Sequence, residues 1–434
     1  MRLSRRGFLS GAASVAVATR ARASQDVDAV VVGAGAAGLA AARKLREAGR
    51  SFVVLEARAR TGGRAFTDTS LGAPFDAGAQ YIHWAERNPW KGIANQLGVP
   101  LQEDEWSDPP RVYVDGVRLS EADRARRSGG FGRIASAISL GANADKSFAD
   151  AVRGASAEVV AAAGGVTQFS LGEDPERVSI ADYQELWSGD DYLVPSGYGA
   201  LVVRHGAEIP VRLQTPVTAI RWNGPGVEIE TPAGVLRAGV AIVTVPVGVL
   251  KAGGIRFSPE LPEPIQSALD GLGMGAYTKI ALRLDRARVG PLDGTDYFEV
   301  LDGARATSFE FWPFGRDLVV AVMGGDHGRR ICEAGEPAAV DFVTERLAAM
   351  VGGGIRGAVL DGRLAGWWTD PHARGSYSVA RPGHLSARIT LRQTLAERVW
   401  FAGEATAGGG AMTVGGATLE GERAAAEAIR KLAG

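Results

Sequence analysis

Apolar and polar positions along the chain fall into runs that together predict an α/β protein. Residues 28–33 form a short β-branched run that ends in glycine, and residues 51–55 form a second one. Such runs are typical of buried parallel strands. Residues 39–48 between them have helical composition, and residues 276–284 alternate as a strand does. Residues 120–165 are rich in Ala, Arg and Ser at helical spacing and predict a small helical subdomain.

The turn between the first strand and the helix carries three glycines with the spacing of a dinucleotide site. Gly33 permits the tight turn, Gly35 lets the backbone approach a pyrophosphate, and Gly38 allows the helix to pack closely on the strand. The helix N-terminus offers N–H donors to the phosphates. The second strand ends in Glu56, where an acid binds the ribose hydroxyls of an adenosine. The spacing and its context predict a Rossmann-like dinucleotide site.

The segment after Glu56 distinguishes a flavin-binding site from a nicotinamide-binding site. Arg58 and the run Gly62-Gly63-Arg64 resemble the extended motif of the flavin amine oxidase superfamily. In that family the paired glycines let the loop pass close to the flavin. An arginine at the position of Arg64 lies near the pyrophosphate, and one at the position of Arg58 borders the adenosine. The resemblance therefore implies FAD as the cofactor.

Resemblance to this family covers most of the chain and implies further contacts with FAD. The family places the backbone at Val217 against the adenine, a glutamate at the position of Glu404 on a ribitol hydroxyl, and the backbone near Val414 at the pyrimidine edge of the flavin. The matching segments are 75–83, 215–220, 226–230, 241–251, 257–262, 399–406 and 413–417. The cofactor-binding residues that the resemblance implies are Gly33, Gly35, Ala36, Ala37, Gly38, Glu56, Ala57, Arg58, Gly62, Gly63, Arg64, Gly78, Ala79, Gln80, Tyr81, Val217, Gly403, Glu404, Thr413 and Val414.

The positions of these segments predict a discontinuous FAD-binding domain of the two-dinucleotide-binding, Rossmann-like kind. We expect it to comprise residues 26–84, 196–256 and 393–434. The inserts, residues 85–195 and 257–392, are expected to build an α+β substrate-binding domain on top of it. The predicted fold class is therefore α/β, with the helical subdomain inside the first insert.

The resemblance also implies which residues carry the chemistry. Lys279 falls on the opposite strand face from Ile280 and the other apolar residues, and in the family a lysine here hydrogen-bonds a water that contacts the flavin. Burial lowers the pKa of a lysine and suits it to proton or oxygen chemistry. Ser376 stands where monoamine oxidases carry a flavin-linked cysteine, so we expect noncovalent FAD.

An aromatic cage is only partly visible in the sequence. Tyr377 matches one wall of the family's cage, which desolvates an amine and aligns it for hydride loss. Thr413 and Gly410 occupy the positions that carry the second wall in two branches of the family. Trp312 and Trp368 are candidates for the missing face, and the core is an equal alternative for each.

His83 matches a histidine beside the flavin of animal polyamine oxidases, where it is a candidate partner of the substrate amine. A histidine satisfied by backbone groups at the domain junction is the alternative. Two interpretations are open for a set of acidic residues: they attract ammonium groups of the substrate, or they belong to solvated loops. These residues are Glu103, Asp104, Glu105, Asp190 and Asp191. The candidate catalytic residues are Lys279, Tyr377, His83 and Trp368.

Composition and charge exclude several other classes of protein. Hydrophobic residues make up 46% and charged residues 22%, as in ordinary globular proteins. The formal net charge of -1 differs from the basic balance of a nucleic-acid binder. A single cysteine, Cys332, excludes an intrachain disulfide and a thiolate cluster. The five histidines lack ligand spacing, so no metal site is expected.

Residues 1–23 predict an export signal rather than a part of the fold. Arg2, Arg5 and Arg6 precede a short apolar stretch, and an A-x-A cleavage site ends at Ala23. Residues 4–9 resemble the twin-arginine consensus, which exports folded proteins. A periplasmic or secreted protein is therefore expected, and removal of five arginines takes the net charge from -1 to -6. No later apolar run in the sequence predicts a membrane-spanning helix.

The sequence thus predicts FAD-dependent oxidative deamination of a small-molecule amine, in which a hydride leaves the α carbon for the flavin and the imine is hydrolysed. Polyamines, aromatic monoamines, cyclic amines and amino acids all remain open as substrates. The electron acceptor is dioxygen, giving hydrogen peroxide, or an exported electron-transfer protein. Two alternatives are a flavin desaturase or porphyrinogen-type oxidase, and a flavin-binding relay subunit without its own substrate. Monomer and dimer are both open.

Overall fold

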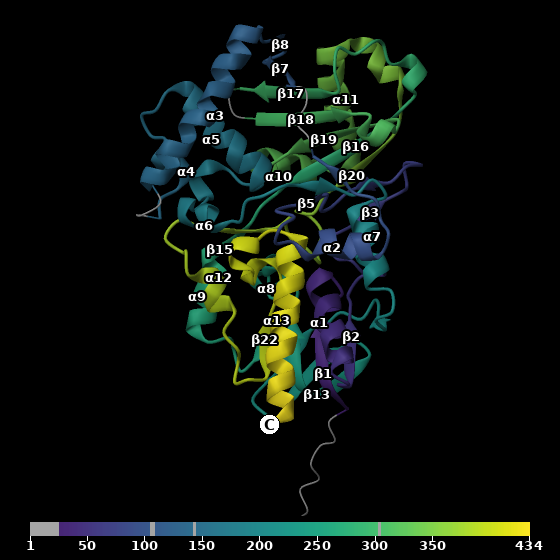
Figure 1. Ribbon diagram of the computed structural model, residues 1–434, viewed down its shortest axis with the longest axis vertical. Helices are drawn as coiled ribbons and strands as arrows, with labels where there is room; N and C mark the ends of the chain where they lie inside the picture. The colour runs from purple at the N-terminus through teal and green to yellow at the C-terminus, as the bar shows by residue number, and fades with distance from the viewer. Residues whose placement is uncertain (1–25, 105–108, 142–144, 303–304) are drawn as a thin grey trace, which may run out of the picture.

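The computed structural model describes residues 26–104, 109–141, 145–302 and 305–434. The expected export signal at residues 1–23 lies outside them. Figure 1 shows an elongated molecule of two stacked lobes, with the C-terminus at the foot of the lower one. Each lobe is organised around one large sheet.

The lower lobe holds an eight-stranded sheet in the order β10-β2-β1-β13-β12-β11-β14, with β22 also paired to β13. Strands β10, β2, β1, β13 and β22 run parallel, as a Rossmann-like domain requires. Residues 29–32 of β1 are all buried, which explains their β-branched, apolar composition. The strands are β1 (Val27–Val32), β2 (Phe52–Leu55), β10 (Val211–Arg212), β11 (Ala219–Arg221), β12 (Val227–Thr231), β13 (Gly234–Val243), β14 (Arg256–Ser258) and β22 (Val399–Phe401).

Helices α1 (Ala36–Glu47) and α13 (Val414–Ala433) lie side by side along this sheet, although they come from opposite ends of the chain (Figure 1). Gly421 permits their close approach, because a Cβ there would lie 2.0 Å from the carbonyl oxygen of Ala37. The C-terminal helix is therefore packed directly against the helix that follows the glycine turn.

The upper lobe holds a seven-stranded sheet in the order β20-β16-β19-β18-β17-β7-β8. Ile280 and Leu282 of β16 pack with Ala339 and Val343 of helix α11 on one face. Lys279 lies on the other face, as the alternation predicts. The elements are β7 (Arg111–Val114), β8 (Val117–Arg118), β16 (Thr278–Leu284), β17 (Asp296–Leu301), β18 (Arg305–Phe311), β19 (Leu318–Met323), α10 (Gly325–Ala334), α11 (Glu336–Val351) and β20 (Val359–Ala365).

A group of helices flanks the upper sheet on one side (Figure 1). Helices α3 (Glu121–Gly141) and α5 (Ala157–Ser170) pack against each other, and Phe148 of α4 is fully buried among them. The remaining elements are β3 (Thr67–Asp68), β4 (Phe75–Asp76), β5 (Tyr81–Ile82), α2 (Pro89–Gln96), β6 (Gln102–Glu103), α4 (Phe148–Ala151), α6 (Ile180–Glu185), β9 (Tyr192–Leu193), α7 (Tyr198–His205), α8 (Val247–Lys251), α9 (Glu263–Gly271), β15 (Leu272–Met274), β21 (Ser378–Ala380) and α12 (Ala387–Leu391).

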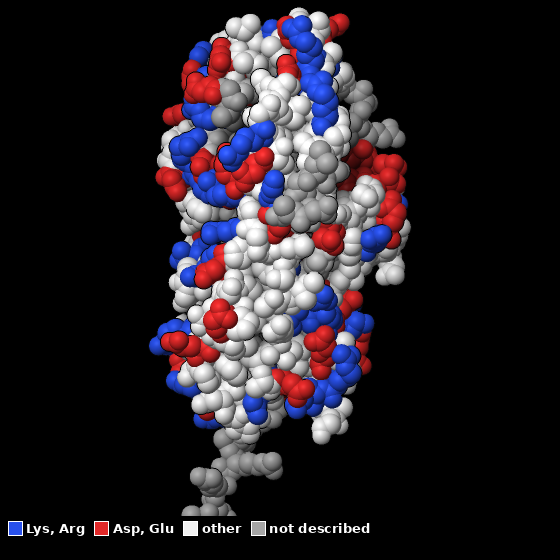
Figure 2. Space-filling model, turned by 90° about the vertical axis from the view of Figure 1, so that its left-hand side faces the viewer, with Lys and Arg blue, Asp and Glu red and all other residues white. Residues whose placement is uncertain are grey.

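Figure 2 shows positive and negative side chains interspersed over one face of the molecule, with uncharged surface between them. The field over that face is therefore mixed in sign. Within the described part of the chain, no helix combines the length and the apolar character that crossing a membrane requires.

Replacement of Gly421 by alanine tests the contact between α1 and α13. The added methyl group would meet the Ala37 carbonyl, so we expect Gly421→Ala to lower the free energy of unfolding by about 1–3 kcal/mol. Gly164 of α5 is the matched control, because a Cβ there meets nothing within 4 Å. Gly164→Ala is expected to raise stability by about 0.5–1 kcal/mol. Urea denaturation of the two variants compares them, and equal stabilities would contradict the close contact.

Candidate functional site

A cavity of about 1630 Å³ lies between the lobes and is lined by both. The predicted residues on its wall are Gly33, Gly35, Ala36, Ala37, Glu56, Ala57, Arg58, Gly62, Gly63, Arg64, Gly78, Ala79, Gln80, Tyr81, His83, Val217, Lys279, Tyr377, Gly403, Glu404, Thr413 and Val414. Stretches that are far apart in the sequence therefore meet there. The volume exceeds the roughly 300–1,000 Å³ of a pocket for one small ligand, which leaves room for a long cofactor and a substrate.

Gly38 and Trp368, from the predicted cofactor-binding and catalytic sets, do not line the cavity. Gly38 lies behind the glycine turn, where a Cβ would stand 1.9 Å from the carbonyl oxygen of Gly33. Its role is close helix packing. Trp368 points elsewhere, since its indole N–H donates to Glu333 (3.1 Å) and the guanidinium of Arg329 lies 4.6 Å from its ring centroid. Its neighbour Trp367 lines the cavity instead.

The glycine turn has the features that a dinucleotide needs. Gly33 adopts φ +104°, a conformation that favours glycine, and α1 begins without a side-chain cap. The first N–H groups of that helix are therefore available to a phosphate. The carboxylate of Glu56 accepts the N–H groups of Ala34 and Arg58, both at 2.8 Å. These two bonds fix the carboxylate at the cavity wall, which fits the adenosine half of FAD.

Glu404 is buried and accepts several hydrogen bonds. Arg64 donates to it at 3.0 Å, and Ser378 donates both its N–H (3.0 Å) and its hydroxyl (2.7 Å). Burial alone would raise the pKa of Glu404, but the charges of Arg64 and Arg388 outweigh it and lower the pKa. The carboxylate is thus held ionised at the wall where the family places a ribitol hydroxyl.

Arg58 makes a bidentate ion pair with Asp370, with N–O distances of 2.6 and 2.7 Å. Its guanidinium also lies 5.7 Å from the ring centroid of Trp367. Because Asp370 belongs to the second insert, this pair fastens the first flavin segment to the substrate-binding part of the chain. Arg58 is therefore a cross-link as well as a part of the cavity wall.

Lys279 is buried and uses all three of its N–H donors on protein oxygens. They point to the carbonyls of Asp76 (2.9 Å) and Gly78 (3.0 Å) and to Oε1 of Gln80 (2.8 Å). Burial lowers the pKa of Lys279 to about 8, although the charges of Asp76 and Glu310 partly offset it. A bridging water, which the resemblance implies, would have to replace one of these three acceptors.

The motif comparison missed a second tyrosine on the cavity wall. Tyr277 lies beside Tyr377 in the cavity wall, with ring centroids 6.1 Å apart. Thr413 instead caps α13, accepting the N–H of Gly416 at 3.0 Å. Trp312 is not on the cavity wall and packs in the core of the upper sheet. The alternating strand pattern contained the signal, since Tyr277 shares a face with Lys279 two residues later.

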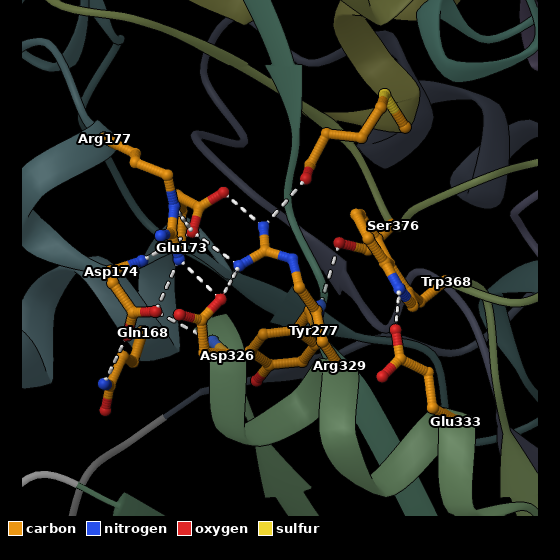
Figure 3. Close-up of polar contacts among 11 residues, drawn as sticks. Gln168, Glu173, Asp174, Arg177, Tyr277, Asp326, Arg329, Glu333, Trp368 and Ser376 are labelled. Carbon is orange, nitrogen blue, oxygen red and sulfur yellow. Dashed lines mark hydrogen bonds and ion pairs between the residues drawn. The ribbon is translucent and has the colours of Figure 1, made fainter. Parts of the chain in front are cut away.

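Ser376 also lies on the cavity wall, and its hydroxyl accepts the N–H of Tyr277 at 3.0 Å (Figure 3). The hydroxyl thus holds the backbone of Tyr277. Cys332 is buried outside the wall, with its sulfur 3.1 Å from the hydroxyl of Thr278. The chain therefore presents no thiol to the cavity from its described residues.

His83 is held by a side chain rather than by backbone. Its Nδ1 lies 2.8 Å from Oδ2 of Asp191, and its ring stacks on Tyr81 with centroids 5.3 Å apart. Both His83 and Asp191 line the cavity. Because the bond engages Nδ1, the Nε2 atom is left for a ligand.

Two further carboxyl groups in the wall escaped the sequence analysis. Asp296 of β17 and Glu310 of β18 are direct cross-strand partners and both face the cavity. Burial, and then the charge of Asp296, raise the pKa of Glu310 to about 7. The signal was present in the strand pattern, because Phe309 and Phe311 flank Glu310 and pack on the opposite face.

A family model described as flavin containing amine oxidoreductase matches residues 36–160 and 181–429. The chain belongs to this family. Its cofactor is accordingly FAD, and the protein is an enzyme of the amine oxidase class. The glycine turn, Glu56 and Glu404 fit that cofactor as described above.

Individual relatives agree with this assignment. The chain is 28% identical to polyamine oxidase 4 of Oryza sativa subsp. japonica, over 93% of this chain and 88% of that one. It is also 28% identical to lysine-specific histone demethylase 1 homolog 2 of Arabidopsis thaliana, but spans only 58% of that relative's length. A putrescine oxidase variant of solved structure, described as a redesign of cofactor binding, has a TM-score of 0.76 at 21% identity. It covers 93% of this chain and 99% of its own, and shows the fold.

Acid precipitation tests the expectation of noncovalent FAD. Because Ser376 replaces the flavin-linked cysteine and Cys332 lies off the cavity wall, we expect all flavin absorbance in the supernatant. Cys332→Ser should behave like the wild type in this assay. Yellow protein in the wild-type pellet would contradict the expectation.

Proposed function

We propose that this enzyme oxidises a diamine or polyamine, with Glu310 and Asp296 binding a second ammonium group of the substrate. The observation that carries this proposal is the pair of facing carboxyls on adjacent strands of the cavity wall. Two acids so placed repel each other, and this repulsion adds to the effect of burial, which is the larger cause of the raised pKa of Glu310. A cation between them removes the repulsion, so an ammonium group is the fitting occupant.

The similarity to polyamine oxidases, and the shared fold with a putrescine oxidase, support a substrate of this class. Asp104 and Asp191 add further negative charge to the wall. Arg124 and Arg127 also line the cavity, so the wall as a whole is mixed in sign. Within it, the facing Glu310 and Asp296 form the acidic site that favours a substrate with a second ammonium group.

FAD, when bound, supplies the two-electron oxidation of the amine. The chain binds, orients and desolvates the substrate. The rings of Tyr277 and Tyr377 lie against each other and offer one aromatic surface to the reacting amine, which shields it from water. His83, held by Asp191, offers Nε2 to the amine and favours its neutral form. Lys279 fixes the backbone of the second flavin segment through its three hydrogen bonds.

Replacement of Glu310 by glutamine tests the second-ammonium site. Loss of a charge-assisted hydrogen bond is worth about 1.5–3 kcal/mol, so kcat/KM for putrescine is expected to fall by roughly 10- to 150-fold. For butylamine, which lacks the second ammonium, we expect less than about a threefold change. Exposed Glu260, which does not line the cavity, provides the control Glu260→Gln. Equal losses for the two amines in Glu310→Gln would contradict the proposal.

The pH profile of the same variant gives a second readout. Below pH about 7 the Glu310 carboxyl is protonated and cannot pair with an ammonium, because burial and Asp296 raise its pKa. We therefore expect kcat/KM for putrescine to rise through pH about 7 in the wild type, and to lack this limb in Glu310→Gln.

We also propose that the twin-arginine signal at residues 1–23 exports the protein already folded. The cavity is assembled from separated stretches of chain, so FAD has a complete site only on the folded chain. Arg5→Lys combined with Arg6→Lys is expected to leave the flavoprotein in the cytoplasmic fraction. Arg2→Lys, outside the paired arginines, should be exported as the wild type is. Unchanged export of the double variant would refute this route.

A further inference from the structure

A cluster of charged side chains lies next to Tyr277, and its members do not line the cavity (Figure 3). It joins η2, a short 3-10 helix (Pro175–Arg177), and the preceding loop to helix α10. Its members are Gln168, Glu173, Asp174, Arg177, Asp326 and Arg329. The proposed function gives these residues no role.

The loop that follows α5 touches both tyrosines. The hydroxyl of Tyr377 donates to the carbonyl of Ser170 (3.3 Å), and the N–H of Ala276 donates to the carbonyl of Gly172 (2.7 Å). A Cβ on Gly172 would lie 3.2 Å from Cβ of Tyr277 and 3.3 Å from the hydroxyl oxygen of Tyr377. The loop at 170–172 therefore limits the separation and tilt of the two rings.

Glu173, the next residue, fastens this loop to α10. Its side chain is 5% exposed and accepts from Arg329 (2.9 Å) and from Arg177 (2.8 Å). Asp174 accepts from Arg177 (2.7 Å) and from the N–H of Asp326 (2.8 Å). Arg329 also donates to Asp326 (2.7 Å). The loop thus cannot shift without separating Glu173 from Arg329, a pair that is largely withdrawn from water.

Arg329 also reaches the other side of the tyrosine pair. It donates to the carbonyl of Met274 (3.3 Å), the last residue of β15, three positions before Tyr277. Its guanidinium lies over the ring of Trp368. One planar, fork-shaped group therefore fixes the loop behind the rings and the strand end that leads into Tyr277.

We propose that Arg329 and Glu173 are positioning residues that set the geometry of the Tyr277–Tyr377 slot and so the orientation of the amine. The proposal rests on the proposed function, because the slot is where the reacting amine is placed. A support that holds rings from behind acts on orientation, whereas Glu310 and Asp296 act on affinity. The two contributions are therefore separable in the kinetic constants.

Arg329→Met is expected to lower kcat for putrescine by about 10- to 100-fold, since a misplacement on the order of 1 Å costs about that much. KM should change by less than about threefold, because the second ammonium remains bound. Arg329→Lys should not restore kcat, since it lacks the fork. Arg356→Met is the matched control, because Arg356 makes a bidentate but exposed pair with Glu345. Glu173→Gln provides a milder variant that keeps the side-chain shape if Arg329→Met fails to fold.

A spectroscopic measurement tests the positioning role of Arg329 and Glu173 independently of turnover. In protein labelled with 3-fluorotyrosine, Tyr277→Phe and Tyr377→Phe assign two ¹⁹F resonances. We expect Arg329→Met or Glu173→Gln to shift both resonances, and Arg356→Met to shift neither. If the wild type oxidises no amine, the proposed function fails while the resonances still test the positioning role.

Two results would overturn the inference. One is unchanged resonances together with unchanged kcat. The other is a loss of FAD binding in parallel with kcat, measured by flavin fluorescence, which would make the cluster a general support of the fold.

Discussion

A line of buried charges joins the two lobes, and both walls of the cavity depend on it. Arg388, which is 2% exposed, donates to both carboxylate oxygens of Asp182 (2.7 and 2.9 Å) and to the hydroxyl of Ser378 (2.6 Å). Ser378 donates to Glu404, which also accepts from Arg64. Removal of one partner would leave a buried charge uncompensated, at a cost of about 3–5 kcal/mol. The helical group, the upper lobe and the flavin segments therefore form one unit around this line.

Two further charged side chains connect distant parts of the chain on other sides of the cavity. Lys279 binds the second flavin segment from the upper sheet through the carbonyls of Asp76 and Gly78. Arg58 binds the second insert from the lower lobe through Asp370. In each case a charged group from one lobe finds its partners only in a distant part of the chain. The cavity is thus bounded by contacts that exist only when the discontinuous segments have assembled, which matches a cofactor that touches several of them.

Local features of the site could be predicted from the sequence, and features made by distant pairs could not. Gly33 and Glu56 were predictable because the conformation of one turn and the end of one strand determine their roles. Glu310 acquires its raised pKa from burial and then from Asp296, across a strand pair whose register the sequence does not reveal. Trp368 was misplaced because only the neighbouring helix, not the local pattern, draws its indole toward Glu333. Tyr277 was visible as an alternating strand residue, but no motif marked it.

Thr413, at the position that carries a second cage residue in one branch of the family, has a structural role in this chain. Thr413 caps α13 at the flavin segment, so a small hydroxyl side chain is needed there. Tyr277, which directly precedes β16, lines the cavity together with Lys279. Gly172 leaves just enough room for both tyrosines to stand in contact with the loop behind them. Tyr277 and Lys279 are thereby carried by one short stretch of chain at the start of β16, so the placement of Tyr277 is coupled to the anchoring of Lys279 in the flavin segment.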